Sequence, residues 1–334
     1  MKRLRLAVIF GGRSGEYEVS VVSARSVMKA LDPKKFSILP IKISKTGVWS
    51  RQLKKSEVDV VFPLVHGTFG EDGCLQGFLE ILDIPYIGCN VLASSIGMDK
   101  VVQKQIFLHA GLPIVDHQWF MAYAWKKDPR DIVRRIEKSL GYPLFVKPAN
   151  MGSSVGISRA GDRKALVAGV RLALKYDEKA LVERAVSRAR EIEVAVLGND
   201  DPRASVPGEV ISSNEFYDYD AKYVDGASKS IIPAKLTEKQ RRTIQEMAVK
   251  CFRAIDGKGM ARVDFLISNR GQIFLNEINT IPGFTEISMF PKLWRASGLS
   301  YPRLLKCLIV LALKRHAKRA GLFRSYRPKS GWWI

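Results

Sequence analysis

The sequence has few cysteines and no long apolar run. Its four cysteines lie far apart and form no Cys-x-x-Cys pair: Cys74, Cys89, Cys251 and Cys307. This spacing indicates neither a zinc site nor a disulfide framework, and reduced cytosolic thiols are expected. No segment approaches the roughly 20 apolar residues that span a bilayer. The apolar run at residues 4–10 leads into two glycines, which predicts a first β-strand and not a signal peptide.

Acidic residues are scarce toward the C-terminus. The chain has 54 Lys and Arg against 33 Asp and Glu, a formal net charge of +21. No acidic residue follows Glu286, whereas eleven basic residues do. Such a segment is able to bind nucleic acid or an anionic membrane. A solvated basic face is the favoured interpretation, because the sequence lacks the interleaved aromatic and basic residues of single-strand binders.

The 334 residues suffice for two or three domains, and the first 90 alternate predicted strands with helices. Strands are expected at residues 4–10, 36–43 and 58–64. Glycine-rich turns follow at residues 11–16 and 66–73. Ligands of open α/β sheets bind beyond the carboxyl ends of the strands, so Glu16 and His66 are expected near one crevice. Each turn alone is a weak signal, since a lone histidine is more often structural.

A second α/β unit leads into a loop of small residues at 148–157, directly after Lys147. Backbone amides of such a loop are able to cradle phosphate oxygens, and the lysine adds a positive charge. The Walker A pattern is absent. A Ser-Gly turn without a ligand remains the alternative.

Residues 259–283 carry the sharpest chemical pattern. Alternation of apolar and polar residues predicts two strands, at 261–267 and 272–278, joined by a turn. Pairing of these strands would bring together the oxygen donors Asp264, Glu277 and Asn279, with Arg262 on the same face. Three oxygen donors suit a hard cation such as Mg²⁺ that bridges phosphates. The alternative is a hairpin with a solvated charged face.

Seven motifs in order make the chain recognisable. They are GGRSGEYEVS (11–20), HGTFGEDG (66–73), MDK (98–100), VKPANMGSSVG (146–156), FYDYDAKY (216–223), ARVDF (261–265) and NEINTIPGFTEISM (276–289). Together they resemble the D-alanine–D-alanine ligases of the ATP-grasp superfamily, over roughly residues 4–315. The resemblance implies an α/β fold, α+β in part, with three domains and a tail. The expected ranges are 1–99 (N-terminal parallel-sheet domain), 100–186 and 187–315 (the two ATP-grasp lobes) and 316–334 (basic tail).

The resemblance implies ATP-dependent joining of two D-alanines through a D-alanyl phosphate, for peptidoglycan precursors. It also implies a cytoplasmic homodimer with ATP as co-substrate and two Mg²⁺ ions, or Mn²⁺, and with no specific nucleic-acid partner and no transmembrane segment. The implied ATP contacts are Lys100, Lys147, Ser153, Ser154, Val155, Glu183, Val186, Glu191, Lys222 and Asn276. The implied metal ligands are Asp264, Glu277 and Asn279. D-Alanine would meet Glu16, His66, Ser288 and Met289. The implied catalytic set is Glu16, Ser153, Tyr223, Arg262 and Gly283, in which Arg262 and the Gly283 N–H face the oxyanion.

Two departures and several alternatives accompany this resemblance. The connection between Glu183 and Glu191 is one residue longer than usual, which shifts the register at Val186, and the basic tail is no family feature. The alternatives are a D-alanine–D-lactate ligase, another ATP-grasp carboxylate–amine ligase, a non-catalytic relative, and a nucleic-acid or membrane-surface protein. Tyr223 in the FYDYDAKY loop favours peptide formation, because depsipeptide relatives replace this loop.

Overall fold

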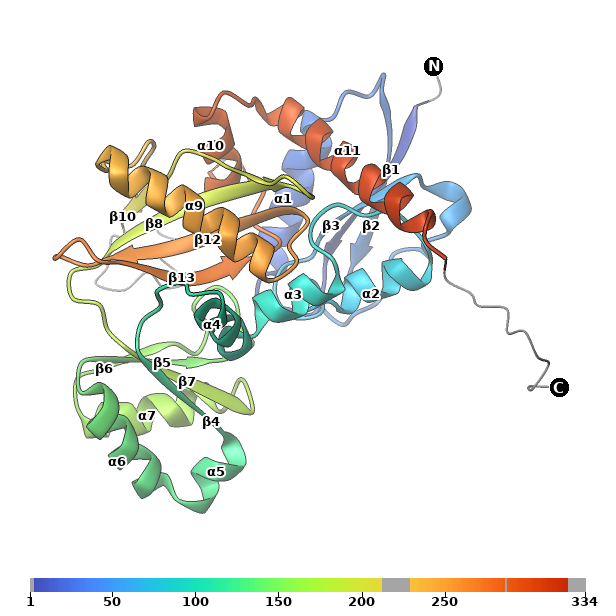
Figure 1. The fold of residues 1–334 in the computed structure, drawn as a ribbon. Coiled ribbons are helices and arrows are strands. Elements are labelled where there is room, and N and C mark those ends of the chain that lie inside the picture. Colours follow the sequence, from blue (N-terminus) through green and yellow to red (C-terminus); the bar gives the residue numbers. More distant parts are fainter. Residues whose placement is uncertain (1–2, 212–228, 286, 324–334) are drawn as a thin grey trace, which may run out of the picture.

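The computed structural model describes residues 3–211, 229–285 and 287–323, and these form three β-sheets covered by helices (Figure 1). One sheet is parallel and two are antiparallel. The expected α/β fold with an N-terminal parallel sheet and two further lobes is therefore confirmed. Each sheet is built from one continuous range of the sequence. The domain boundaries at 99, 186 and 315 stay predictions.

The parallel sheet is built by the N-terminal residues in the order β2-β1-β3. Its strands are β1 (Leu4–Gly11), β2 (Phe36–Ile43) and β3 (Val60–Leu64). The helices beside it are α1 (Tyr17–Ala30), α2 (Cys74–Ile81) and α3 (Val91–Met98), with a short 3₁₀ turn, η1 (Lys55–Glu57). Strand β1 ends at Gly11, whose φ is +91° and whose added Cβ would lie 2.1 Å from the Ile43 oxygen. Only glycine permits this turn at the carboxyl edge of the sheet.

The second sheet forms a lobe of its own, at the bottom of Figure 1. Its order is β4-β7-β5-β6, all antiparallel. The strands are β4 (His117–Met121), β5 (Leu144–Pro148), β6 (Ser158–Ala160) and β7 (Lys179–Arg184). The helices of this lobe are α5 (Ala122–Lys127), α6 (Pro129–Leu140) and α7 (Arg163–Ala173). The apolar faces of α6 and α7 pack with one face of the sheet in a single buried cluster. The opposite face, which carries Lys147 and Glu183, therefore points away from this helix layer.

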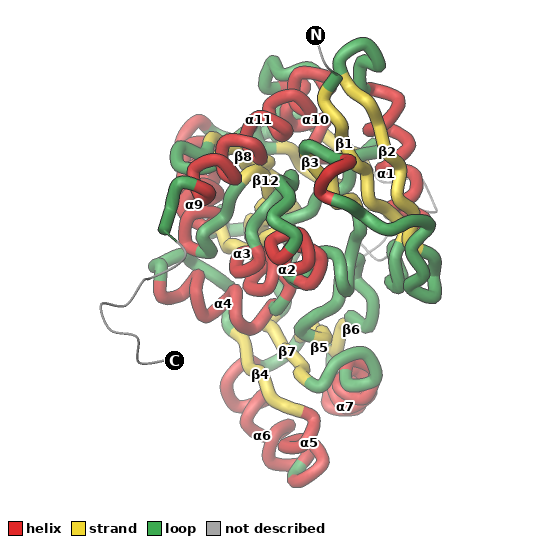
Figure 2. Tube along the Cα trace, turned by 90° about the vertical axis from the view of Figure 1, so that its right-hand side faces the viewer, coloured by secondary structure: helices red, strands yellow, loops and turns green. Residues whose placement is uncertain are grey.

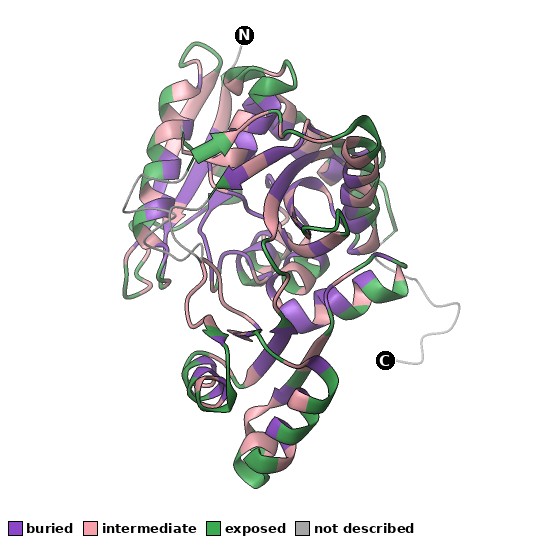
Figure 3. Cartoon of the chain, turned by 90° about the vertical axis from the view of Figure 1, so that its left-hand side faces the viewer, coloured by how far each residue is buried: buried purple, intermediate pink, exposed green. Residues whose placement is uncertain are grey.

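The third sheet has the order β11-β10-β8-β12-β13, with β9 paired to β8. Its strands are β8 (Arg190–Gly198), β9 (Arg203–Ala204), β10 (Gly208–Ile211), β11 (Lys229–Ile231), β12 (Gly259–Ile267) and β13 (Ile273–Asn279). Helix α9 (Glu238–Ala254) begins with a capping box at Thr237 and Gln240 and covers one face of the sheet. Figure 3 shows how buried residues line the sheets while the outward faces of the helices are exposed.

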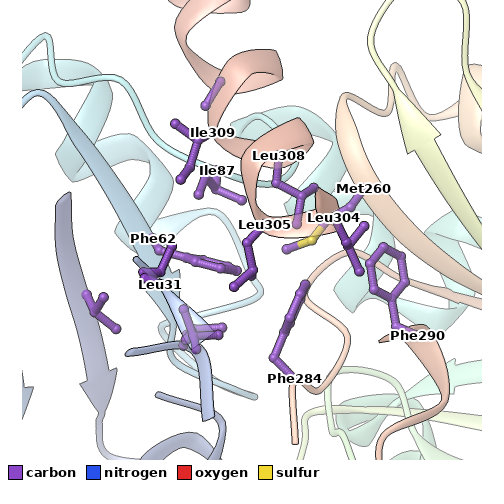
Figure 4. Packing of buried hydrophobic residues seen from close by; sticks show 14 of the residues in the cluster. Leu31, Phe62, Ile87, Met260, Phe284, Phe290, Leu304, Leu305, Leu308 and Ile309 are labelled. Atoms are coloured by element: carbon purple, nitrogen blue, oxygen red, sulfur yellow. The ribbon is translucent and has the colours of Figure 1, made fainter. Parts of the chain in front are cut away.

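The C-terminal helices join the first and third sheets. They are α10 (Met289–Ala296) and α11 (Tyr301–Ala320). Leucines of α11 pack against Phe62 of β3, Met260 of β12 and Phe284 in one buried cluster (Figure 4). The rings of Phe62 and Phe284 meet edge to face at 5.1 Å. The predicted boundary at residue 315, between the second ATP-grasp lobe and the basic tail, lies within α11. This helix runs unbroken to Ala320.

No single helix of the described residues is long and apolar enough to cross a membrane. Helices α10 and α11 meet the length and composition criteria only when taken together, and the chain bends by 104° between them.

Two helices meet at Asp99. Helix α3 ends at Met98, and α4 (Lys100–His109) begins after Asp99. The Asp99 side chain accepts hydrogen bonds from the N–H groups of Val101 and Val102, which is a typical N-cap. Figure 2 shows α4 lying between the second sheet and the rest of the molecule. The break therefore places Lys100 at the first turn of α4, beside the junction of the lobes.

Candidate functional site

Charged side chains cross the third sheet in one row. Asp264 on β12 is paired in register with Glu277 on β13 and with Glu193 on β8. Directly opposed residues of neighbouring strands project to the same face, so three carboxylates stand side by side. Arg262, two positions before Asp264, shares this face and pairs in register with Asn279. The predicted hairpin and its shared face are confirmed.

The Arg262 guanidinium is held by two of these carboxylates. Its Nε donates to Asp264 Oδ1 at 2.8 Å and its Nη2 to Asp264 Oδ2 at 2.7 Å. Glu193 Oε2 lies 3.1 Å from the same Nε. Burial alone would lower the pKa of Arg262, but Asp264 and Glu193 raise it well above its ordinary value. Arg262 is therefore a fixed positive charge at the centre of the row.

Asp264, Glu277 and Asn279 offer oxygen donors on this face. Asn279 Oδ1 accepts a hydrogen bond from the Ile281 N–H at 2.9 Å, which orients the amide. Within the described residues, no three His, Cys, Asp or Glu side chains converge on one point. The set is thus two carboxylates and an amide, and such oxygen-only ligands fit Mg²⁺ or Mn²⁺ better than softer metals.

Three lysines surround this row from the side of α4 and the second sheet. Lys100 Nζ donates to the Met151 oxygen at 2.7 Å and lies 3.6 Å from Glu277 Oε2. Lys147 Nζ lies 2.5 Å from Glu183 Oε2. Burial opposes the charge of Lys147, yet Glu183, Glu277 and Glu191 raise its pKa overall. Lys147 belongs to the second sheet, whereas Glu277 and Glu191 belong to the third, so carboxylates of both sheets act on the same ammonium group.

Sequence reasoning missed the third of these lysines, Lys104. Its Nζ lies 2.6 Å from Glu183 Oε1 and donates to the Asn276 oxygen at 3.2 Å. Burial opposes ionisation of Glu183, but Lys104 and Lys147 lower its pKa far below the usual value. A signal for Lys104 was present, because residues four apart on a helix share a face and Lys100 precedes it by four positions. Glu183, predicted to meet adenine, is enclosed by these two lysines in the structure.

The small-residue loop reaches the first domain. The Ser153 hydroxyl donates a hydrogen bond to Glu16 Oε1. Ser153 and Ser154 both have left-handed backbone angles, with φ of 49° and 61°. Val155 closes the turn with a hydrogen bond from its N–H to the Gly152 oxygen at 3.1 Å. The loop after Lys147 and the turn after β1 thus meet at Glu16 and Ser153, two residues that the resemblance places in one catalytic set.

His66 is buried beneath this contact. Its Nδ1 lies 3.1 Å from the Ile281 oxygen and 3.4 Å from Glu71 Oε1, and its Nε2 lies 3.4 Å from Ser23 Oγ. Burial alone would lower the pKa of His66, but the Glu71 carboxylate raises it overall. Burial likewise raises the pKa of Glu71. Sequence reasoning did not assign a role to Glu71, although it lies in the same glycine-rich turn.

The Pro-Gly turn after β13 lies beside Ser288. A Cβ added to Gly283 would lie 2.8 Å from Ser288 Oγ. Ser288 Oγ accepts a hydrogen bond from the Thr285 N–H at 3.0 Å and lies 2.7 Å from the Thr285 hydroxyl. Met289 follows as the first residue of α10. Gly283 and Ser288 thus lie side by side, and Met289 follows Ser288 directly.

Two further predicted residues, Val186 and Glu191, lie in or next to the connection between β7 and β8. Val186 lies half-buried in the connection between β7 and β8. Glu191 projects to the same face of β8 as Glu193, since the two are two positions apart. Lys222 and Tyr223 lie outside the described residues.

Comparisons with known proteins agree along the whole chain. A family model for the D-ala D-ala ligase N-terminus matches residues 5–57 and 50–89, and one for the D-ala D-ala ligase C-terminus matches residues 106–310. A D-alanine--D-alanine ligase from Natranaerobius thermophilus is 47% identical over 96% of this chain and 97% of the relative.

Solved structures give the same result. The D-alanine-D-alanine ligase from Coxiella burnetii has a TM-score of 0.86 and 34% identity, covering 96% of this chain and 97% of that one. The VanG D-Ala:D-Ser ligase from Enterococcus faecalis has a TM-score of 0.82 and 34% identity, covering 93% and 100%.

Proposed function

The chain belongs to the D-alanine–D-alanine ligase family, and from that premise we propose how its residues join two D-alanines at the expense of ATP. The product, D-alanyl-D-alanine, serves peptidoglycan synthesis. In the first step the carboxylate of one D-alanine takes the γ-phosphoryl group of ATP, which yields D-alanyl phosphate and ADP. In the second step the amine of another D-alanine attacks the acyl carbon and phosphate leaves.

One observation carries this assignment. Arg262 and the three lysines Lys100, Lys104 and Lys147 surround the row of carboxylates where the second and third sheets meet. Phosphoryl transfer depends mainly on alignment and on neutralisation of charge. We propose that Lys100 and Lys147 contact the α- and β-phosphates. Glu183 supports this arrangement because one of its oxygens contacts Lys104 and the other contacts Lys147.

Asp264, Glu277 and Asn279 are proposed to hold two Mg²⁺ ions, or Mn²⁺. The oxygen-only donor set described above fits these cations. When bound, such ions would neutralise the negative charge of the reacting phosphates. Arg262 and the Gly283 N–H are proposed to face the oxyanion of the tetrahedral intermediate. Arg262 lies in the row, and Gly283 follows Asn279, the last residue of β13, by four positions.

The two amino acids are proposed to lie on either side of Arg262. Glu16, held by Ser153, would take the ammonium of the first D-alanine, with His66 near its carboxylate. Ser288 and the Met289 N–H would take the carboxylate of the second. Tyr223 is proposed to close the site, and Lys222 is proposed to contact the γ-phosphate. Adenine and ribose contacts are proposed for Glu183, Val186 and Glu191, an ATP contact for Asn276, and phosphate contacts for Ser153, Ser154 and Val155. We further propose a cytoplasmic homodimer without a specific nucleic-acid partner.

Phosphate release from ATP tests the function directly. D-Alanine is expected to stimulate release, L-alanine to leave it at background, and mass spectrometry is expected to detect D-alanyl-D-alanine. Release that does not depend on D-alanine would contradict the assignment.

The likeness to a D-Ala:D-Ser ligase makes the second amino acid a separate question. Mixtures of D-alanine with D-serine or D-lactate are expected to yield mainly D-alanyl-D-alanine at neutral pH. Predominant D-alanyl-D-serine, or efficient ester formation, would reassign the second substrate without changing the reaction class.

A further inference from the structure

Arg262 and a bound cation would compete for the same atoms. Both oxygens of Asp264 accept hydrogen bonds from Arg262, at 2.8 and 2.7 Å. A cation at Asp264, as in the proposed function on which this inference rests, needs at least one of these oxygens. A cation bound there shares the negative charge of this carboxylate and repels the guanidinium, so the bidentate contact weakens while Arg262 has to stay close enough to face the oxyanion.

Glu193 is the second carboxylate in contact with Arg262. It lies on β8 in register with Asp264, its side chain is only 11% exposed, and its Oε2 is 3.1 Å from Arg262 Nε. The proposed cation ligands are Asp264, Glu277 and Asn279, and Glu193 is not one of them. Its carboxylate is directed to the arginine instead.

We propose that Glu193 is a positioning residue that keeps the Arg262 guanidinium in place when Asp264 turns to the cation. It acts through Arg262 and contacts neither substrate nor metal. Without it, Asp264 is the one charged partner of Arg262 within hydrogen-bonding distance among the described residues, and a buried charge holds such a partner strongly. Loss of Glu193 therefore makes Arg262 a stronger competitor for the metal ligand.

Direct metal binding tests this competition without turnover. Mn²⁺ affinity is measured by electron paramagnetic resonance of the free ion, with a non-hydrolysable ATP analogue present. Glu193→Gln is expected to weaken Mn²⁺ binding about ten-fold, the range found when residues supporting metal ligands are lost. In steady-state assays kcat is expected to fall while KM for D-alanine changes little. Unchanged Mn²⁺ affinity in Glu193→Gln would overturn the proposal.

Glu209 on β10 provides a matched control. Its side chain is 12% exposed and makes a bidentate contact with Arg190 at 2.8 and 2.7 Å, in the same sheet but outside the row. Glu209→Gln thus removes an equally buried carboxylate from an arginine pair. Mn²⁺ affinity and kcat are expected to stay at the wild-type level in this variant. An equal loss in both variants would mean that general disturbance of the sheet explains the effect, and would overturn the proposal.

The Arg262→Met background separates positioning from simple charge attraction. Removing a carboxylate near a cation weakens binding through space whether or not the arginine is present. If Glu193 acts through Arg262, Glu193→Gln is expected to change Mn²⁺ affinity about two-fold at most in this background, against about ten-fold with Arg262 present. Equal changes in both backgrounds would overturn the proposal.

Glu193→Asp, which keeps the charge, is expected to recover most of the Mn²⁺ affinity that Glu193→Gln loses. Failure to recover it would also contradict the proposal. Phosphate release by the wild type in the same preparations reports separately on the proposed function.

Discussion

The ammonium of Lys104 on α4 lies 2.6 Å from the carboxylate of Glu183 on β7, and both side chains are almost completely buried. Lys104 also donates to the Asn276 oxygen on β13, so one lysine connects the second sheet with the third. Burial lowers the pKa of Lys104 although Glu183 acts in the opposite direction. This ion pair therefore connects the lobes, and its carboxylate also holds Lys147.

Lys104→Met is expected to destabilise the protein strongly. The substitution keeps the length of the side chain but leaves a buried carboxylate with one lysine partner in place of two. Removal of one partner from a buried pair costs about 3–5 kcal/mol. The free energy of unfolding from urea titration checks this. Lys127→Met, at an exposed position of the same lobe, is expected to change little, and equal stability of the two variants would contradict the prediction.

The hairpin could be predicted from sequence because its determinants are local. Alternation at β12 and β13 and the turn between them placed Arg262, Asp264 and Glu277 on one face. The bulge between Asp264 and Phe265 was not predicted. It depends on how β12 fits between two neighbours, which no short pattern encodes.

Glu193 and Lys104 show where sequence reasoning ends. A glutamate in a strand normally indicates a solvated face, and only the pairing of β8 with β12 places Glu193 beside Arg262. Lys104 lies on the expected helix face, but its partner Glu183 is distant in sequence and comes close only when the lobes pack. In both cases the packing of elements that are distant in sequence decides the contact.

Gly152→Ala is expected to impair use of D-alanine. An added Cβ would lie 2.6 Å from Glu16 Oε2, so the Glu16 carboxylate must move from the position in which Ser153 holds it. A displacement of this kind at a substrate contact is expected to lower kcat/KM for D-alanine about 100-fold. Fluorescent ATP-analogue binding is expected to stay close to wild type.

Gly161→Ala is the matched control, because nothing lies within 4 Å of the Cβ that it adds. It belongs to the same lobe and has no contact with Glu16. Normal kinetics in the control and a raised KM for D-alanine in Gly152→Ala would locate the effect at Glu16. Normal kinetics in both variants would refute the assigned position of Glu16.

Glu71→Gln is expected to reverse the pKa shift of His66. Burial lowers the His66 pKa and Glu71 raises it, with a net increase above 6.5. Without the carboxylate, burial prevails and the pKa is expected to fall below 6.5. Nuclear magnetic resonance of the imidazole carbon in labelled protein follows this titration among the four histidines.

The same change affects stability in a defined direction. The raised pKa of His66 stabilises the fold fully below pH 6.5, and this contribution is lost as pH rises through the folded pKa. A lowered pKa has the opposite effect, so the variant is expected to lose stability as the pH falls from 7 to 6. Urea titrations at both pH values check this, and a parallel pH dependence in wild type and variant would contradict it.

Arg315→Met is expected to loosen the contact between α11 and the first domain. Arg315 is buried, and its guanidinium donates to the Gly88 oxygen and, at 2.9 Å, to the Tyr86 oxygen. It also lies over the Tyr86 ring, 4.4 Å from the centroid. Methionine fills similar space but leaves two carbonyls without these donors, and each unsatisfied buried acceptor costs about 1–3 kcal/mol.

Lys318→Met distinguishes this buried contact from the general basicity of α11. Lys318 pairs with Asp200 at 2.9 Å, but both side chains are largely exposed, so solvent screens the pair and its loss is expected to change stability little. Both variants remove one positive charge from the same helix. If charge repulsion in the basic C-terminal region dominated, both would stabilise the protein equally. Because Gly88 packs against Gly259 at the start of β12, a loss of stability in Arg315→Met alone would show that α11 holds the first and third sheets together.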